Sequence, residues 1–469
     1  MLLTPLLVLF FLLALFTGLL YFGYGYWSWA ATGAVGFLIW AWGGVFSWVF
    51  FGLVAGIFMV YAVVFGLPFL RRRLVSSSLM KVLSGVMPSM SETERIALEA
   101  GTVWWDGELF SGNPDWQKLM DFRPSPLSER ERAFLDGPVT ELCEMIDDWQ
   151  VQQSGDLAPE VWDFLKKNRF FGMIIPEDYG GHGFSALAHS AVVTKIATRS
   201  VPAAVTVMVP NSLGPAELIL HYGTEQQQQQ YLPRLATGEE VPCFALTESN
   251  AGSDAASMTS YGVVCRGNWE GEEVLGIRLN WEKRYITLAP VATVLGLAFQ
   301  LRDPDQLIGD QYDYGITCAL IPASLPGVEI GQRHDPLGVS FMNGPTMGRD
   351  VFVPLEAIIG GPANAGQGWK MLMQCLAAGR GVSLPSLSAG AAQLCTRATS
   401  AYARVREQFN RAIARFEGIE ERLARIAGFT YLLNAARRLT VSAIDAGEKP
   451  AVLTAIMKAY STELMRNVV

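Results

Sequence analysis

A run of small and polar residues between Ala245 and Ser257 has the composition of a loop that binds a negatively charged group. The run reads A-L-T-E-S-N-A-G-S-D-A-A-S, with hydroxyls at Thr247 and Ser253. A redox ring that accepts a hydride becomes anionic, and exposed backbone N–H groups together with Thr247 can stabilise that charge. Gly252 and Ser253 suit a phosphate that approaches bare backbone. The alternative is a polar turn in which Asp254 caps the following segment.

Other catalytic patterns in the sequence are weak. Gly181-His182-Gly183 followed by Ala186 only loosely matches a dinucleotide fingerprint, and no strand pattern precedes it. The sequence has neither a Walker A motif nor a G-x-S-x-G nucleophile elbow. Its 4 histidines and 6 cysteines are too dispersed for a typical metal site. We therefore expect neither hydrolysis nor a metal centre.

The loop at 245–257 opens a predicted β unit, residues 241–365, that lies between two helical regions. Helical periodicity occupies residues 139–240, and long helices return in residues 366–469. The fold class is therefore α+β. The strand-like stretches are Val274–Leu279, Tyr285–Leu288, Val291–Leu297, Ile316–Ile321 and Val351–Val353, and the late helices are Trp369–Phe409 with a break near Pro385, Phe416–Ala446 and Pro450 to the end.

The 469-residue chain combines two chemically different parts. It has 36 basic and 44 acidic side chains, and the first charged residue is Arg71. The net charge of −8 gives no cationic surface, which argues against nucleic acid as the main partner. Residues 71–138 are predicted to form a connector in which Ser91 to Glu94 and Ser128 to Glu131 are capping boxes of short helices.

Residues 1–70 predict a membrane anchor of two or three transmembrane helices. Leu2–Leu20, Ala30–Val49 and Phe51–Leu70 are each close to the roughly 20 residues that cross a bilayer. Tyr21–Trp29 is rich in tyrosine and tryptophan, as interfacial residues are. Arg71, Arg72, Arg73 and Lys81 follow, so the positive-inside rule places the rest of the chain in the cytoplasm.

The 245–257 run closely resembles the first signature of the acyl-CoA dehydrogenase family. The resemblance covers residues 135–469, and the anchor together with the N-G-P-T segment at Asn343–Thr346 resembles the bacterial, membrane-associated FadE-type branch, which implies an inner-membrane location. Further matching segments are F-F-G-M-I-I-P-E-D-Y-G-G at Phe170–Gly181, P-N-S-L-G-P-A-E-L at Pro210–Leu218, H-Y-G-T-E-Q at His221–Gln226, K-R-Y-I-T-L-A at Lys283–Ala289 and G-Q-G-W-K-M-L at Gly366–Leu372.

The resemblance implies an FAD site and assigns its residues. Phe244, Leu246 and Thr247 match family positions that face the flavin. Ser253 matches a serine that lies by the FAD pyrophosphate and the substrate. Tyr285 and Thr287 would close over the flavin ring.

Two arginines extend this implied site. Arg406 matches the arginine of R-x-x-F-G that reaches FAD of a neighbouring subunit, although Asn410 replaces the usual glycine. Arg380 matches an arginine on the acyl-CoA side of the family's active site. The alternative is that Arg380 is an ordinary arginine on a helix surface. A homo-oligomer is implied with Arg406.

The implied reaction is the dehydrogenation of medium- or long-chain acyl-CoA to trans-2-enoyl-CoA, the first step of fatty acid β-oxidation. Electrons would pass to an electron-transfer flavoprotein or a membrane acceptor. A glutamate must remove the α proton; in most relatives it lies beyond the position of Val469, and the alternative position here is Gly379. No catalytic base is therefore assigned, which suggests a C-terminally truncated enzyme. The alternatives are a membrane-tethered acyl-CoA or flavin binding protein without a base, and a flavin oxidase.

Overall fold

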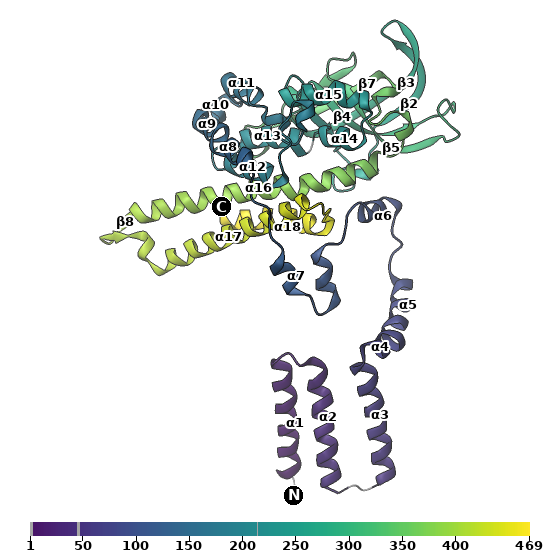
Figure 1. Cartoon of the computed structure of the whole chain (residues 1–469), viewed down its shortest axis with the longest axis vertical. Helices are drawn as coiled ribbons and strands as arrows, with labels where there is room; N and C mark the ends of the chain where they lie inside the picture. Colours follow the sequence, from purple (N-terminus) through teal and green to yellow (C-terminus); the bar gives the residue numbers. More distant parts are fainter. Residues whose placement is uncertain (1–2, 45–46, 213) are drawn as a thin grey trace. The chain divides into compact units, whose positions relative to one another are not determined.

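The computed structural model describes residues 3–44, 47–212 and 214–469 and divides into two compact units, Met1–Met90 and Ser91–Val469. Each unit is described by itself. In Figure 1 the first unit contains α1 to α5 and the second contains the remaining helices and all the strands.

The first unit consists of apolar helices with exposed side chains. α1 (Leu3–Tyr21), α2 (Gly25–Trp42) and α3 (Trp48–Gly66) lie side by side. By length and composition, Thr4–Tyr21 and Trp48–Gly66 could each cross a membrane, and neither is buried. A third such stretch, Val201–Tyr222, is 88% buried inside the second unit, so its apolar composition serves the protein core.

The helix ends differ from the predicted apolar runs. α2 begins at Gly25 rather than Ala30, so it includes most of the predicted aromatic belt, and α3 begins at Trp48 rather than Phe51. The hydropathy pattern does not locate the turn at Gly23, whose φ of +81° favours glycine. Leu2, Val45 and Phe46 of the predicted runs lie outside the described residues.

The boundary between the two units falls within the predicted connector, so the second unit begins at Ser91 with short helices, of which two start at the predicted capping boxes at Ser91 and Ser128. The segment contacts the turn that precedes the last helix, because Thr102 N–H donates to Lys449 O (2.8 Å) and Lys449 N–H donates to Thr102 Oγ1 (3.1 Å). Its elements are α6 (Glu92–Glu99), a 3₁₀ turn (Trp105–Ser111), α7 (Trp116–Asp121) and α8 (Glu129–Asp136).

The helical domain that follows has its own core, in which Leu142, Leu165, Phe170 and Ile196 are fully enclosed. Its last helix leads directly into the sheet. Its elements are α9 (Pro138–Met145), α10 (Asp148–Ser154), α11 (Pro159–Lys167), α12 (Ala186–Ala197), α13 (Val201–Ser212), α14 (Ala216–Tyr222) and α15 (Glu225–Thr237).

The central sheet has the strand order β1-β4-β2-β3-β7-β6, with β5 paired to β4. β4 is parallel to β1 and β2, and the other neighbours are antiparallel. Two of the predicted strand stretches are parts of the single long strand β3. The strands are β1 (Pro242–Ala245), β2 (Tyr261–Trp269), β3 (Glu272–Thr287), β4 (Val294–Arg302), β5 (Asp313–Pro322), β6 (Val328–Ile330) and β7 (Asn343–Pro354).

Three long helices complete the second unit: α16 (Gly368–Val405), α17 (Glu417–Asp445) and α18 (Ala451–Val468). Figure 1 shows α16 running along the helical domain and toward the sheet, and α16 contacts α12, α13 and β5. The predicted break near Pro385 is wrong, because α16 continues through it. The short hairpin of β8 (Glu407–Gln408) and β9 (Arg411–Ala412) joins α16 to α17.

Candidate flavin site

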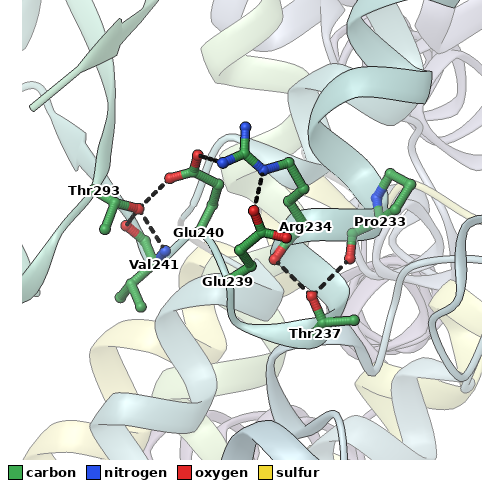
Figure 2. A network of polar contacts seen from close by, with 7 residues as sticks. All are labelled: Pro233, Arg234, Thr237, Glu239, Glu240, Val241 and Thr293. Carbon is green, nitrogen blue, oxygen red and sulfur yellow. Dashed lines mark hydrogen bonds and ion pairs between the residues drawn. The ribbon is translucent and has the colours of Figure 1, made fainter.

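The junction between α15 and β1 fixes the strand that leads into the 245–257 loop. Figure 2 shows Arg234 at the end of α15 paired with Glu239 and Glu240, each at 2.9 Å. Glu240 in turn accepts a hydrogen bond from the Thr293 hydroxyl, and Val241 N–H donates to Thr293 Oγ1 (2.8 Å). One threonine before β4 therefore holds the first residue of the β unit.

Replacing Thr293 with valine should loosen this junction. Val241 N–H and Glu240 each lose a partner, which we expect to lower the free energy of unfolding by about 1 kcal/mol. Thermal unfolding of the variant would measure this. Thr237→Val, which removes only hydroxyl contacts within α15, serves as the control. An equal decrease in the free energy of unfolding of the two variants would contradict the role of Thr293 in holding the junction between α15 and β1.

The 245–257 loop lies against the far end of β3. β1 ends at Ala245, and Arg284 N–H then donates to Thr247 O (2.9 Å), so Thr247 lies next to the K-R-Y-I-T segment. The half-buried ring of Phe244 lies against Gly296 on β4, where an added Cβ would come within 2.7 Å of it. Glycine at 296 is therefore required for β1 and β4 to pack around Phe244.

A buried ion pair holds the loop from beneath. Lys283 is fully buried, and its Nζ donates to Glu248 Oε1 (2.9 Å) and to Leu246 O (3.0 Å). Glu248 also accepts hydrogen bonds from Thr259 N–H (2.7 Å) and Ser260 N–H (3.0 Å). The two side chains thus join β3 to both ends of the loop, which fixes the path of the backbone between Leu246 and Ser260.

The environment of this pair keeps Glu248 ionised. Burial alone would raise the pKa of Glu248, but hydrogen bonds from Ser260, Thr259 and Lys283 outweigh it and lower the pKa to about 2. Burial lowers the pKa of Lys283, and the interaction with Glu248 partly offsets that effect.

These values predict an acid-dependent contribution of Glu248 to stability. Its pKa is lower in the folded chain than the 4.5 expected when unfolded, so its contribution is complete above about pH 4.5 and is lost as the pH falls toward 2. Unfolding titrations of the parent chain and of Glu248→Gln at several pH values measure it. The difference in stability between the two should shrink below pH 4.5, and a difference independent of pH would contradict the assignment.

Asn343 fixes the orientation of the residues at the end of β3. Its Nδ2 donates to Tyr285 O (3.1 Å) and to Thr287 Oγ1 (3.2 Å), while His334 Nδ1 lies 3.0 Å from Asn343 Oδ1. Tyr285 has a φ of +60°, and the β3–β7 register shifts between Lys283 and Ile286. Because the Thr287 oxygen already accepts a hydrogen bond, its own proton remains free to be donated.

The structure brings five of the sequence-predicted residues to neighbouring segments. Leu246 and Thr247 follow β1, and Tyr285 and Thr287 end β3, while Phe244 lies within β1. Ser253 is exposed farther along the loop, beside Gly252, where an added Cβ would meet no protein atom within 4 Å. The space next to this bare backbone is open, as a ligand that approaches it requires.

A cavity of about 340 Å³ opens beside the loop. Ser249, Arg284, Arg333 and His334 are among the residues that line it. The Tyr285 ring lies 5.1 Å from the His334 ring and under the Arg284 guanidinium, also at 5.1 Å. Glu282 also lines this cavity, but with Arg284 and Arg333 the arginines outnumber it, which favours an anionic ligand group.

Arg406 and Arg380 lie apart from these residues. Arg406 is exposed at the C-terminal end of α16, just before the β8–β9 hairpin. A helix of 38 residues is about 57 Å long, and its other end contacts the sheet, so Arg406 does not join the loop of its own chain. Arg380 is half-buried within α16. The roles of both arginines stay predictions.

Sequence reasoning missed Asn343 and the pairing of Lys283 with Glu248 as positioning contacts. Lys283 and Glu248 are 35 positions apart in sequence, and they meet because the loop lies against β3. Asn343 and Thr287 are 56 positions apart, and they meet because β3 pairs with β7. The available signals were the polar residues of the N-G-P-T and K-R-Y-I-T segments, which lie in β7 and β3.

Comparison with known proteins agrees with this architecture. Three domain families match in chain order: Acyl-CoA dehydrogenase, N-terminal domain, at residues 127–239; middle domain, at residues 243–351; and C-terminal domain, at residues 366–469. Butyryl-CoA dehydrogenase from Megasphaera elsdenii superposes with a TM-score of 0.64 at 24% identity, over 74% of this chain and 87% of that chain.

Two curated relatives are longer than the segments they share with this chain. Protein HemX of Proteus mirabilis is 61% identical over 104 residues, which are 22% of this chain and 61% of that protein. Probable acyl-CoA dehydrogenase FadE10 of Mycobacterium tuberculosis is 27% identical over 382 residues, which are 80% of this chain and 56% of that protein. The chain thus spans about three fifths of the length of these relatives.

A helical domain, a sheet that carries a hydroxyl-bearing loop and a set of long helices make up the acyl-CoA dehydrogenase fold. The chain belongs to the acyl-CoA dehydrogenase family, whose cofactor is FAD. The residues at the loop fit that cofactor, because open space beside Gly252, the free Thr287 proton and the arginine-lined cavity supply what a flavin with a pyrophosphate needs.

Proposed function

We propose that the protein catalyses FAD-dependent α,β-dehydrogenation of medium- or long-chain acyl-CoA to trans-2-enoyl-CoA, the first step of fatty acid β-oxidation. The observation that carries this proposal is that Thr247 lies beside Arg284 on β3, the strand that ends at Thr287, with the Thr287 oxygen held by Asn343. Electrons would pass to an electron-transfer flavoprotein or to a membrane acceptor.

Bound FAD would supply the hydride acceptor, and the chain would hold and polarise it. Phe244, Leu246 and Thr247 would hold the ring from β1 and the loop, and Tyr285 and Thr287 from β3. Ser253 and the neighbouring backbone would bind the pyrophosphate and approach the substrate. Preorganised N–H and O–H donors stabilise developing negative charge without reorganisation. This stabilisation is the main contribution of a protein to hydride transfer onto a bound cofactor.

Glu248 is unsuitable as the base that removes the α proton. Its two oxygens already accept hydrogen bonds from Lys283, Thr259 and Ser260, and its low pKa makes it a poor proton acceptor at neutral pH. Its position beneath the loop assigns it to holding the backbone.

We further propose that α1 and α3 anchor the protein in the bacterial inner membrane, with the second unit in the cytoplasm. Their length, their apolar composition and their exposed side chains support this. The cations that follow α3, beginning at Arg71, support the orientation.

Anaerobic titration of the full-length protein with acyl-CoAs of graded length tests the proposal. The purified protein should be yellow, and a medium- or long-chain acyl-CoA should bleach the flavin. A protein that stays colourless after FAD is added contradicts the flavin site. A yellow protein that binds acyl-CoA without bleaching supports a binding protein, and peroxide release during turnover supports an oxidase.

A further inference from the structure

The segment after α3 forms an amphipathic helix with its apolar side uncovered. α4 (Pro68–Arg71) and a π-helical turn (Arg72–Ser76) lead into α5 (Ser77–Val86). Large apolar side chains recur in α5 at spacings of one, three and four residues, which places them on one face. They are Leu79, Met80, Val82, Leu83 and Val86, with exposed fractions of 57%, 65%, 66%, 51% and 79%.

The opposite face of α5 is polar, and its surroundings are purely cationic. Ser77, Ser78, Lys81 and Ser84 form that face. Arg71, Arg72 and Arg73 precede it, and the sequence has no acidic residue before Glu92. The first unit therefore carries four positive charges within eleven positions and no negative charge to neutralise them.

We propose that residues 71–90 bind the anionic surface of the bilayer, with α5 lying in the plane of the interface. Helices of this kind bury their apolar face at the boundary of headgroups and acyl chains and direct their cations to anionic lipids. Only ten residues separate Gly66, the last residue of α3, from Ser77, so the chain cannot carry α5 far from the membrane that α3 is proposed to cross. This inference rests on the proposed anchoring.

A lipid surface explains both features of the segment, and a protein partner explains only one. Five large apolar side chains exposed on ten residues would favour aggregation in water. A second copy of the chain could cover the apolar face, but it would bring four further cations to the same place. An anionic bilayer covers the apolar face with acyl chains and neutralises the cations with its headgroups.

Hydrogen exchange of the full chain in nanodiscs tests this directly. Backbone amides of Ser77–Val86 should exchange at least about tenfold more slowly in phosphatidylethanolamine–phosphatidylglycerol nanodiscs than in phosphatidylcholine nanodiscs, since each cation near an anionic surface is worth about fivefold in binding. Equal exchange in the two lipids overturns the proposal. Protection that appears only in nanodiscs holding two chains also overturns it, in favour of a second copy.

Matched variants separate the two parts of the interaction. Leu79→Gln/Leu83→Gln should abolish protection in both lipids, whereas Ser78→Gln/Ser84→Gln, on the polar face, should leave it unchanged. Arg72→Gln/Arg73→Gln, which leaves Arg71 and Lys81 in place, should reduce the preference for phosphatidylglycerol. Equal loss in the apolar-face and polar-face variants contradicts the proposed orientation. Flavin content and bleaching of the same samples report on the proposed function independently, so failure of one is distinguishable from failure of the other.

Discussion

Lys283→Met is expected to remove most of the bound FAD and to lower the free energy of unfolding by about 3–5 kcal/mol. The substitution leaves Glu248 as a buried carboxylate without its cation, and it also removes the donor to Leu246 O. The loop between Leu246 and Ser260 then keeps only the backbone hydrogen bond from Arg284 N–H to Thr247 O as its link to β3 near Thr247. Chemical denaturation and the ratio of flavin to protein absorbance measure the two effects.

Two further variants identify the buried charge as the cause. Lys283→Met/Glu248→Gln removes both charges and should recover a large part of the stability, because no uncompensated ion remains. Lys370→Met, at an exposed position of α16, should change neither quantity. Full flavin content in Lys283→Met, or a double variant no better than the single one, would show that the pair does not hold the loop.

The position of the loop at the entry to the β unit could be predicted from the sequence, whereas the contacts that hold it could not. In a regular strand, Lys283 and Tyr285 would face the same side of the sheet. The structure instead buries Lys283 fully and leaves Tyr285 more than half exposed. The register shift after Lys283 and the positive φ of Tyr285 separate the two side chains, and neither leaves a signal in residue types alone.

The fold was predicted at the level of helical, β and helical regions, and this order is confirmed. Individual helices and strands were predicted less well than this order. β2 was missed because its polar residues resemble a turn region, although Glu270-Gly271, with φ of +53° and +94°, marks the two-residue loop of a hairpin. Local propensity predicts a helix break near Pro385, but α16 packs on α12, α13, α17 and α18, which keeps it continuous.

Arg406 illustrates a different kind of gap. Its type and motif were visible in the sequence, yet its position depends on the length of α16, which carries it away from the sheet of its own chain. The proposed contact with FAD therefore needs a neighbouring subunit. Substitution of Arg406 would therefore change FAD binding only in the assembled protein. Substitutions of Lys283 and Thr287 would act on contacts within one chain.

Thr287→Val is expected to slow flavin reduction by acyl-CoA about 10²- to 10³-fold in the full-length protein, with flavin content nearly unchanged. Asn343 Nδ2 donates to Thr287 Oγ1, so the hydroxyl proton is directed away from Asn343 and can be donated to the cofactor. Valine keeps the shape of the side chain and removes only that donor. Stopped-flow bleaching under anaerobic conditions measures the rate.

Asn343→Asp distinguishes the orientation of the hydroxyl from its mere presence. An aspartate cannot donate to Tyr285 O or to Thr287 Oγ1, and it would instead accept the Thr287 proton. The hydroxyl would then point away from the cofactor, so Asn343→Asp should slow bleaching in the same direction as Thr287→Val although Thr287 is intact. Thr237→Val, on α15, should bleach at the parent rate. If Asn343→Asp reduced flavin as fast as the parent while Thr287→Val did not, the orienting role of Asn343 would be wrong and Thr287 would act alone.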